Sequence, residues 1–429
     1  MSESVTTGSN DTGMTATTPT PRPTLYRRRD FYFFVAARFW STCAMQVQSV
    51  AIGWQIYELA RTPLALGLVG LCQFGPMLLL TLPAGEISDR FGQRRVFAAA
   101  ATVQGVCSAL FLLLSFVYPG TAWPFYAVLL LFGAARGFAG PSGQSLLAFL
   151  VPPEQLPRAI ALNSSVFTTA VIAGPALGGF LYAFGSVPTY SLCLAGFLIS
   201  AALVSVLGGR RLAAVATGLS RLERVREGIQ FVRRRPILLG AISLDLFAVL
   251  LGGATALLPV FARDILHAGP VGLGLLRSAP AVGAGVTALI LSRWPVERAA
   301  GVKMFYGVAV FGLATVVFGL SRIFALSLGA LVVLGASDMI SVYVRSTLIN
   351  LATPDAMRGR VGAVNMLFIG ASNELGEFES GITAAWFGTI PAVVIGGLGT
   401  LGVVALWMWL FPPLRTVDRL TDVAPADGP

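Results

Sequence analysis

The chain has 429 residues, of which 55% are hydrophobic and 12% are charged. A water-soluble globular protein of this length cannot bury so much apolar surface, so lipid must be the solvent for much of the chain. At about 20 apolar residues per span, the composition predicts about twelve membrane-spanning helices. The net charge of +10 is spread in clusters between apolar runs, without a basic face carrying interleaved aromatics, which argues against nucleic-acid binding.

The N-terminal stretch 1–26 is rich in Ser, Thr, Gly and Pro and lacks an apolar core, so we expect a disordered tail and no cleavable signal. The arginines at 27–29 imitate a twin-arginine signal, but the apolar run behind them is too long for one. The four cysteines fall inside apolar runs without CxxC spacing, which indicates packing and predicts neither a disulfide nor a metal site.

Twelve apolar runs bounded by Gly, Pro or charge predict an all-α membrane protein made of two six-helix halves. The first half, 27–207, is expected to hold spans at 31–59, 64–84, 96–118, 123–150, 159–184 and 188–207. An arginine-rich cytoplasmic connector, 208–236, comes next. The second half, 237–412, is expected to hold spans at 237–261, 269–291, 302–320, 324–344, 361–387 and 392–411. A cytoplasmic tail, 413–429, ends the chain.

Orientation follows from the basic residues, because Lys and Arg resist translocation. Of the 30 Lys and Arg, 23 fall in the tails and loops of one side, and the opposite side holds Arg61, Arg263 and Arg322. Both termini and the connector are therefore predicted to be cytoplasmic, which requires an even number of spans.

The loops after the fourth and tenth spans carry a trace of an internal repeat. Arg158 and Asn163 in the first loop have the same spacing as Arg360 and Asn365 in the second. This match supports two parallel halves related by a six-helix period.

The loop between the second and third spans carries a GxxxDRxGxRR pattern. Its glycines allow a tight turn, its acidic residue suits a helix junction, and its arginines anchor the cytoplasmic edge. With this spacing the chain resembles the major facilitator superfamily, although Gln93 stands where many members have a basic residue. The resemblance implies a conformational loop motif made of Gly85, Asp89, Arg90, Gly92 and Arg94.

Arg136 is expected near the bilayer midplane, where an unpaired guanidinium costs several kcal/mol, so it needs a partner or water. With Gly140 it resembles the family's fourth-helix RxxxG motif, which is associated with proton coupling, although Ala139 replaces the usual Gln. A purely structural ion pair is the alternative.

The fifth span contains a GPxxGG element that resembles the fifth-helix motif of facilitator exporters. Its members are Gly174, Pro175, Gly178 and Gly179, while Ala170 replaces an expected upstream glycine. Small residues allow close helix approach and proline bends a helix, so the element is a candidate pivot. Ordinary small-residue packing is the alternative.

The eleventh span carries three carboxylates in an otherwise apolar segment, Glu374, Glu377 and Glu379. Together with the GWQIYEL stretch at 53–59, this segment resembles the enterobactin-exporter branch of the superfamily, in which many members are drug efflux pumps. Glu374 and Glu377 share one helix face near the midplane, and two adjacent carboxylates in a low dielectric cannot both stay ionised cheaply. We therefore predict that one of them carries the coupling proton, and that Glu379 pairs with an arginine on a neighbouring helix.

Two further acidic residues, Asp245 and Asp338, are candidates for the same role. Asp338 and Arg345 lie seven residues apart, on nearly one helical face, and are expected to face the protein interior. The alternative is that all the intramembrane carboxylates simply satisfy Arg277 or Arg345.

Other chemistries are excluded by the residues present. The single lysine, Lys303, cannot complete a GxxxxGK phosphate loop, and the single histidine, His267, cannot form an HExxH or Ser/His/Asp site. The sequence thus predicts no enzyme, no cofactor and no metal. It predicts instead a monomeric, proton-driven exporter of a small organic molecule, such as a siderophore or a drug, in the bacterial inner membrane. An importer is the alternative within the family, and a membrane-embedded enzyme is a weaker one.

Overall fold

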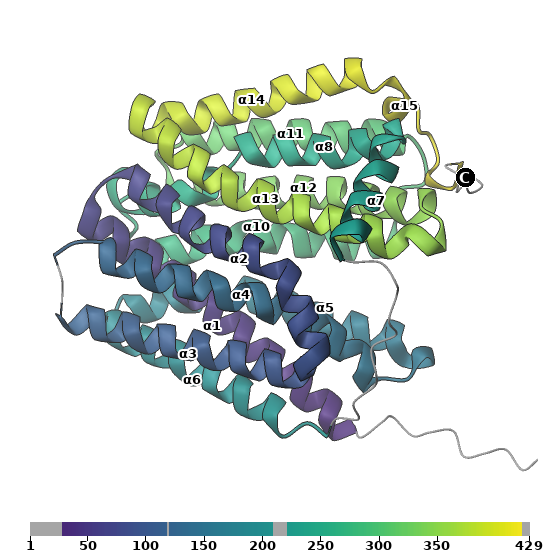
Figure 1. Ribbon diagram of the computed structural model, residues 1–429. Helices are drawn as coiled ribbons and strands as arrows, with labels where there is room; N and C mark the ends of the chain where they lie inside the picture. Colours follow the sequence, from purple (N-terminus) through teal and green to yellow (C-terminus); the bar gives the residue numbers. More distant parts are fainter. Residues whose placement is uncertain (1–27, 118–119, 209–220, 423–429) are drawn as a thin grey trace, which may run out of the picture.

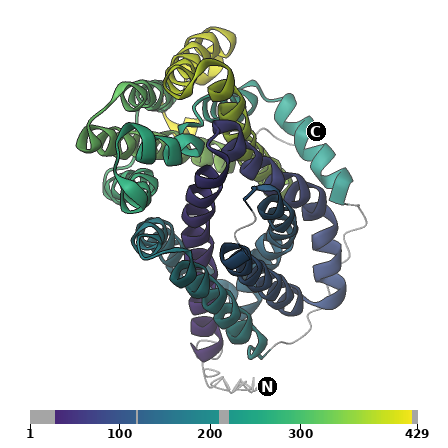
Figure 2. The same ribbon diagram turned by 90° about the vertical axis from the view of Figure 1, so that its left-hand side faces the viewer.

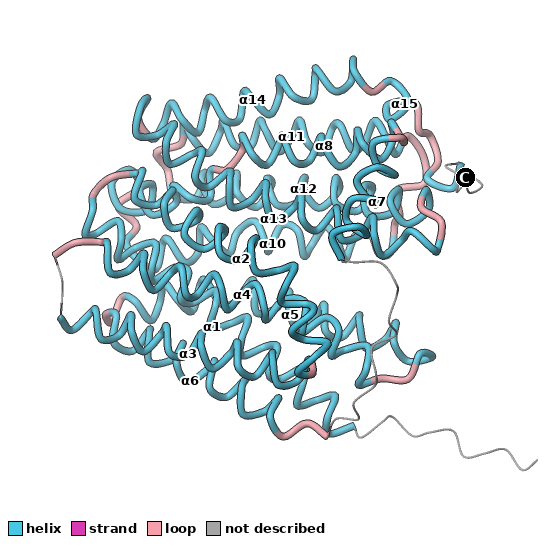
Figure 3. Tube along the Cα trace, viewed as in Figure 1, coloured by secondary structure: helices cyan, strands magenta, loops and turns pink. Residues whose placement is uncertain are grey.

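The computed structural model describes residues 28–117, 120–208 and 221–422, and within these ranges the regular structure is helical throughout (Figure 3). The predicted tail 1–26, the connector residues 209–220 and the last residues, 423–429, lie outside the described part. All-α architecture, as predicted, lets each membrane-spanning segment satisfy its own backbone hydrogen bonds in lipid.

The first half contains six long helices. They are α1 (Arg28–Ala60), α2 (Pro63–Phe91), α3 (Gln93–Val117), α4 (Trp123–Leu150), α5 (Leu156–Tyr182) and α6 (Ser186–Ser205). Helix starts follow local chemistry, since α2 and α4 both have proline in their first turn, where a missing N–H costs nothing. Gly92 ends α2 with a φ of 92°, which favours glycine.

The second half is preceded by a short helix, α7 (Arg221–Arg233), in the connector. Its spans are α8 (Pro236–Leu251) with its continuation, α10 (Gly269–Arg293), α11 (Ala300–Leu320), α12 (Phe324–Ala352), α13 (Asp355–Phe387) and α14 (Thr389–Leu410). The continuation of α8 is irregular. It consists of the 3₁₀ turn η2 (Ala254–Leu257), α9 (Leu258–Val260) and the π-helical turn η3 (Phe261–Ile265). The short α15 (Pro412–Arg415) and η4 (Leu420–Asp422) follow α14.

Ten of the described helices are long and apolar enough to cross a membrane by length and composition. The other two expected spans, α1 and α13, are 33 residues each and carry more polar residues, including the three glutamates of α13. They pack among the ten, so the predicted set of twelve long helices is present in the described chain.

The two halves form separate bundles that meet at one end and diverge toward the other (Figure 1). Figure 2 looks onto the closed end and shows the green and yellow helices of the second half above the purple and blue helices of the first. The most extensive contacts between the halves are made by two helix pairs, α2 with α13 and α5 with α10. This pairing places four helices around the surface where the halves face each other.

Glycines make the contact at the closed end. A Cβ added to Gly67 would lie 3.1 Å from the Cα of Gly381, and one added to Gly179 would lie 2.9 Å from the Cα of Gly274. At both crossings the helix backbones therefore touch without intervening side chains.

The opposite end is open. Along residues 160–169 of α5, every side chain is exposed apart from Asn163 and Val166, so most of the circumference of this stretch is uncovered. The arginine-rich α7 lies across this end of the second half in Figure 1. It is held by Val232, which is buried in an apolar cluster with α13, and by an ion pair of 2.5 Å between Glu227 and Arg360.

Candidate functional site

Charged side chains meet between the halves near the middle of the helices. Arg136 lies at the centre of α4, about 20 Å from each end at 1.5 Å per residue. Its Nη1 atom lies 3.1 Å from Oε1 of Glu374 on α13 and donates a hydrogen bond of 3.0 Å to Oε1 of Gln73 on α2. The side chains of the ion pair are 23% and 14% exposed, so the bridge is largely removed from water. It joins the first half directly to the second.

Glycines bring the three helices close enough for this contact. A Cβ on Gly133 of α4 would lie 2.2 Å from the carbonyl oxygen of Gln73, and one on Gly70 of α2 would lie 3.0 Å from Cβ of Glu377. On α13, Gly376 packs against the backbone of α8. Glu374 lies three residues before Glu377 and therefore on the same face of α13. Both carboxylates are directed toward the first half.

A second contact between the halves lies beside the first. Arg277 on α10 donates a hydrogen bond to Oγ of Ser49 on α1. A cavity of about 20 Å³ is bordered by both residues and by Gln73 and Glu377. A cavity of this size with several polar partners has room for one water molecule.

These side chains form one polar cluster, which consists of Ser49, Gln73, Arg136, Arg277, Glu374 and Glu377. It contains two arginines and two carboxylates. Arginine does not release its proton in proteins, so only Glu374 and Glu377 can change the charge of the cluster. Each half sends one arginine toward the other, Arg136 from the first and Arg277 from the second. The ionisation state of the carboxylates therefore bears directly on the contact between the halves.

The other two acidic candidates, Asp245 and Asp338, belong to α8 and α12 of the second half. Asp245 on α8 forms an ion pair with Arg345 on α12, and both residues are buried. Asp338 lies seven residues before Arg345 on α12 and is half-buried. The expected arginine partner of Glu379 is replaced by Thr383 on the same helix, whose hydroxyl donates to Oε1 over 2.6 Å. A hydroxyl one turn away satisfies this carboxylate without an interhelical contact.

The GxxxDRxGxRR loop forms the junction between α2 and α3. Asp89 lies in the last turn of α2 and accepts a hydrogen bond of 3.4 Å from Gln93, the first residue of α3. Gly92 makes the turn, and Arg94 donates to the carbonyl oxygen of Leu207 beyond α6. The motif thus ties three helices together at the arginine-rich end. Its other two members, Gly85 and Arg90, lie in the last turns of α2.

The GPxxGG element packs α5 against a helix on each side. A Cβ on Gly174 would lie 2.6 Å from a side chain of α1, and one on Gly178 would lie 3.0 Å from its backbone. On the other side, a Cβ on Gly179 would lie 2.3 Å from a carbonyl oxygen of α10, and the Pro175 carbonyl faces Gly274. The element therefore holds both a contact within the first half and a contact between the halves.

The profile of one protein family, described as transmembrane secretion effector, matches residues 24–427, which is nearly the whole chain. The chain belongs to this family of major facilitator transporters. Among solved structures, the inward-facing, occupied form of a bacterial homologue of the human lysosomal transporter Spinster superposes with a TM-score of 0.73. It is 12% identical and covers 95% of this chain and 100% of its own. That likeness confirms the fold.

Three relatives of this facilitator chain span most of its length. The multidrug efflux pump Tap of Mycobacterium tuberculosis is 27% identical over 396 residues, covering 87% of this chain and 93% of the relative. The enterobactin exporter EntS of Citrobacter koseri is 26% identical over 387 residues, covering 88% and 91%. A Na⁺, Li⁺, K⁺/H⁺ antiporter of Planococcus maritimus is 24% identical over 371 residues, covering 78% and 85%. The facilitator is therefore a multi-pass membrane transporter and not an enzyme.

Sequence reasoning missed two members of the polar cluster, Ser49 and Gln73, and named Arg277 only as a possible ion-pair partner of the carboxylates. A polar residue within an apolar run was the available signal, since amides and hydroxyls in transmembrane helices usually face other helices. Many such residues occur in this chain, and only packing shows which of them meet.

Proposed function

We propose that this facilitator is a proton-coupled antiporter that exports a small organic molecule, as a monomer, across the bacterial inner membrane. Its halves correspond to residues 27–207 and 237–412, with both termini in the cytoplasm, as the distribution of arginines favours. The observation that carries the proposal is the ion pair between Arg136 and Glu374, which joins the halves beside a second carboxylate, Glu377. In this orientation the described state is closed outward and open to the cytoplasm.

The ion pair explains how the empty carrier is held in the inward-open state. Ionised Glu374 holds Arg136 and with it the first half, so an empty, deprotonated transporter stays in the inward-open state. A cargo molecule that contacts either residue breaks the bridge, and so does a proton that neutralises the carboxylate. From the inward-open state, a carrier loaded with cargo or with a proton therefore changes state more readily than an empty one.

The relatives support export and proton exchange. Two carry the names of a drug efflux pump and an enterobactin exporter, and the third is named as a cation/H⁺ antiporter. The cargo class we propose is accordingly a drug or a siderophore. Metabolites secreted by a deletion strain and its parent, compared under iron limitation and under drug challenge, identify which of the two is exported.

The coupling proposal is tested in proteoliposomes with an imposed pH gradient and the cargo found in that comparison. Glu374→Gln or Glu377→Gln should abolish uphill cargo movement while sparing downhill exchange, because an amide in place of the coupling carboxylate takes up no proton. Glu379→Gln is the matched control, since Glu379 lies on the same helix and bonds only within it in the described contacts. Cargo accumulation at wild-type rates in both test variants would show that the proton site lies elsewhere.

A further inference from the structure

A second cavity lies at the closed end, inside the first half and away from the polar cluster. Its volume is about 240 Å³, enough for a small organic molecule. It is bordered by the last turns of α1, by Ser115 near the end of α3, and by the junction of α5 and α6. Gly185 at this junction has a φ of 111°, a conformation that favours glycine, and it lets the chain turn tightly into α6.

The wall of this cavity is preorganised. The Gln55 side chain is 5% exposed, donates a hydrogen bond of 3.0 Å to Ser115 and accepts one of 2.7 Å from the hydroxyl of Tyr190. These bonds fix the polar side chains of α1, α3 and α6 against one another. An incoming ligand therefore meets a rigid wall and does not have to order it.

The cavity has one formal charge among its lining residues, the carboxylate of Glu58. The ring of Tyr182 and the side chain of Leu59 add aromatic and apolar surface, and the hydroxyl of Ser186 adds a polar group. A carboxylate beside an aromatic ring is the chemistry that recognises organic ammonium groups.

A cation from the protein already pairs with the same carboxylate. Arg263 in η3 lies 3.6 Å from Glu58 Oε1, and its guanidinium lies over the ring of Trp54, 5.7 Å from the centroid. Beside it, the hydroxyl of Tyr57 donates to Asp264, also in η3. These contacts cross from the first half to the second and so contribute to the closed end.

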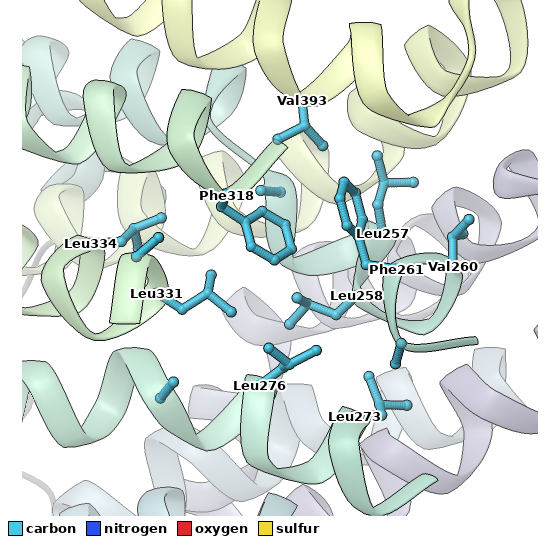
Figure 4. Close-up of a cluster of buried hydrophobic side chains, with 14 of the residues drawn as sticks. Leu257, Leu258, Val260, Phe261, Leu273, Leu276, Phe318, Leu331, Leu334 and Val393 are labelled. Atoms are coloured by element: carbon cyan, nitrogen blue, oxygen red, sulfur yellow. The ribbon is translucent and has the colours of Figure 1, made fainter. Parts of the chain in front are cut away.

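The segment that carries Arg263 is firmly held. Leu257, Leu258, Val260 and Phe261 pack into an apolar cluster with side chains of α10, α11, α12 and α14 (Figure 4). This cluster also includes Val50, Trp54 and Leu66 of the first half. Because η3 is packed into this cluster, Arg263 occupies a fixed place next to Glu58, and it does not itself border the cavity.

We infer that this cavity is a binding site for small organic ammonium ions, which compete with Arg263 for Glu58 and thereby weaken the closed end. The site is independent of the proposed coupling residues, since none of them borders it. Choline is a suitable probe, because it carries a quaternary ammonium and a hydroxyl and fits the volume. Its uncharged carbon isostere, 3,3-dimethyl-1-butanol, has the same shape.

The test is calorimetric titration of both compounds into the full-length protein in detergent. Choline should bind at least about tenfold more tightly than the isostere, because a charge-assisted contact is lost with the ammonium. Glu58→Gln should remove that difference. Glu154→Gln, an exposed carboxylate near the open end, should leave it unchanged. Arg263→Gln should tighten choline binding, because Glu58 then has no competing cation.

The last variant separates recognition from a merely structural role. If Glu58 only stabilised the fold, loss of its Arg263 partner would weaken binding or leave it unaltered. Equal affinity for choline and its isostere, undiminished binding to Glu58→Gln, or no choline binding to the wild-type protein would each overturn the inference. A folded Arg263→Gln protein with unchanged or weaker affinity would overturn the competition.

Discussion

The ion pair between Arg136 and Glu374 should set the balance between the inward-open and outward-open states. Its N–O separation of 3.1 Å corresponds to about 5 kcal/mol of direct attraction at an effective dielectric constant of about 20. Desolvation and partial exposure of both side chains reduce this to a net value of about 2 kcal/mol. Glu374→Gln should therefore shift the ratio of the two states about 30-fold toward the outward-open form.

The shift is measurable as a distance across the closed end. Spin labels on cysteines at Thr62 and Phe387, in a background without the native cysteines, report opening between α2 and α13. All variants are measured at the same pH. Glu379→Gln again serves as the control and should change the ratio less than twofold, since its carboxylate bonds within α13.

A double-mutant cycle decides whether the pair itself is responsible. Arg136→Gln and Glu374→Gln should each shift the ratio, and the double variant should shift it about as much as either single variant. The coupling energy that is missing from the sum should be about 2 kcal/mol. Additive shifts, or an equal response to Glu379→Gln, would refute this account.

Three other substitutions test separate parts of the fold. Asp89→Asn should cripple transport while leaving membrane insertion intact, because it removes charge from the α2–α3 junction; normal efflux from the folded variant would contradict this role. Asp245→Asn leaves Arg345 buried and unpaired, so it should lower the free energy of unfolding by about 3–5 kcal/mol and with it the melting temperature. An unchanged melting temperature would show that the pair contributes nothing. Gly228→Leu should detach α7 from α13, since a Cβ at this position would lie 2.7 Å from the Arg360 carbonyl oxygen. Limited proteolysis should then cut the connector faster. An unaltered rate would show that this contact does not hold α7 on α13.

The spans were predictable because hydropathy reports transfer into lipid directly. Their ends were less so: α12 continues to Ala352, beyond the expected 344, and α13 begins at Asp355, before the expected 361. These extensions are polar turns outside the apolar runs, which hydropathy does not recognise as helix. Packing of α7 on α13 helps to order them. The break of α8 at Gly252 had a signal in its glycine pair, but the π-helical turn that follows has no comparable signal in the residues.

The candidate site was predictable residue by residue, and its pairing was not. Depth along each helix follows from counting residues, so Arg136 and Glu374 could be placed near the midplane separately. Which arginine meets which carboxylate depends on helix rotation and on glycine contacts between distant segments. The sequence therefore left Arg277 and Arg345 as partners for the glutamates, while in the structure Arg345 pairs with Asp245 and Arg136 with Glu374.

The glycine contacts at the closed end bear on how well the transporter prevents ions from leaking across the membrane. A proton antiporter that is open to both sides of the membrane at once lets protons flow down their gradient without moving cargo. At the contact of Gly67 with Gly381, and at that of Gly179 with Gly274, backbone meets backbone, so closure at these two points needs no side chain to find its rotamer. A methyl group at any of these positions would meet the backbone of the facing helix and hold the two helices apart. In the proposed proton antiporter, such a methyl group should cause a proton leak that slows growth even when no cargo is present.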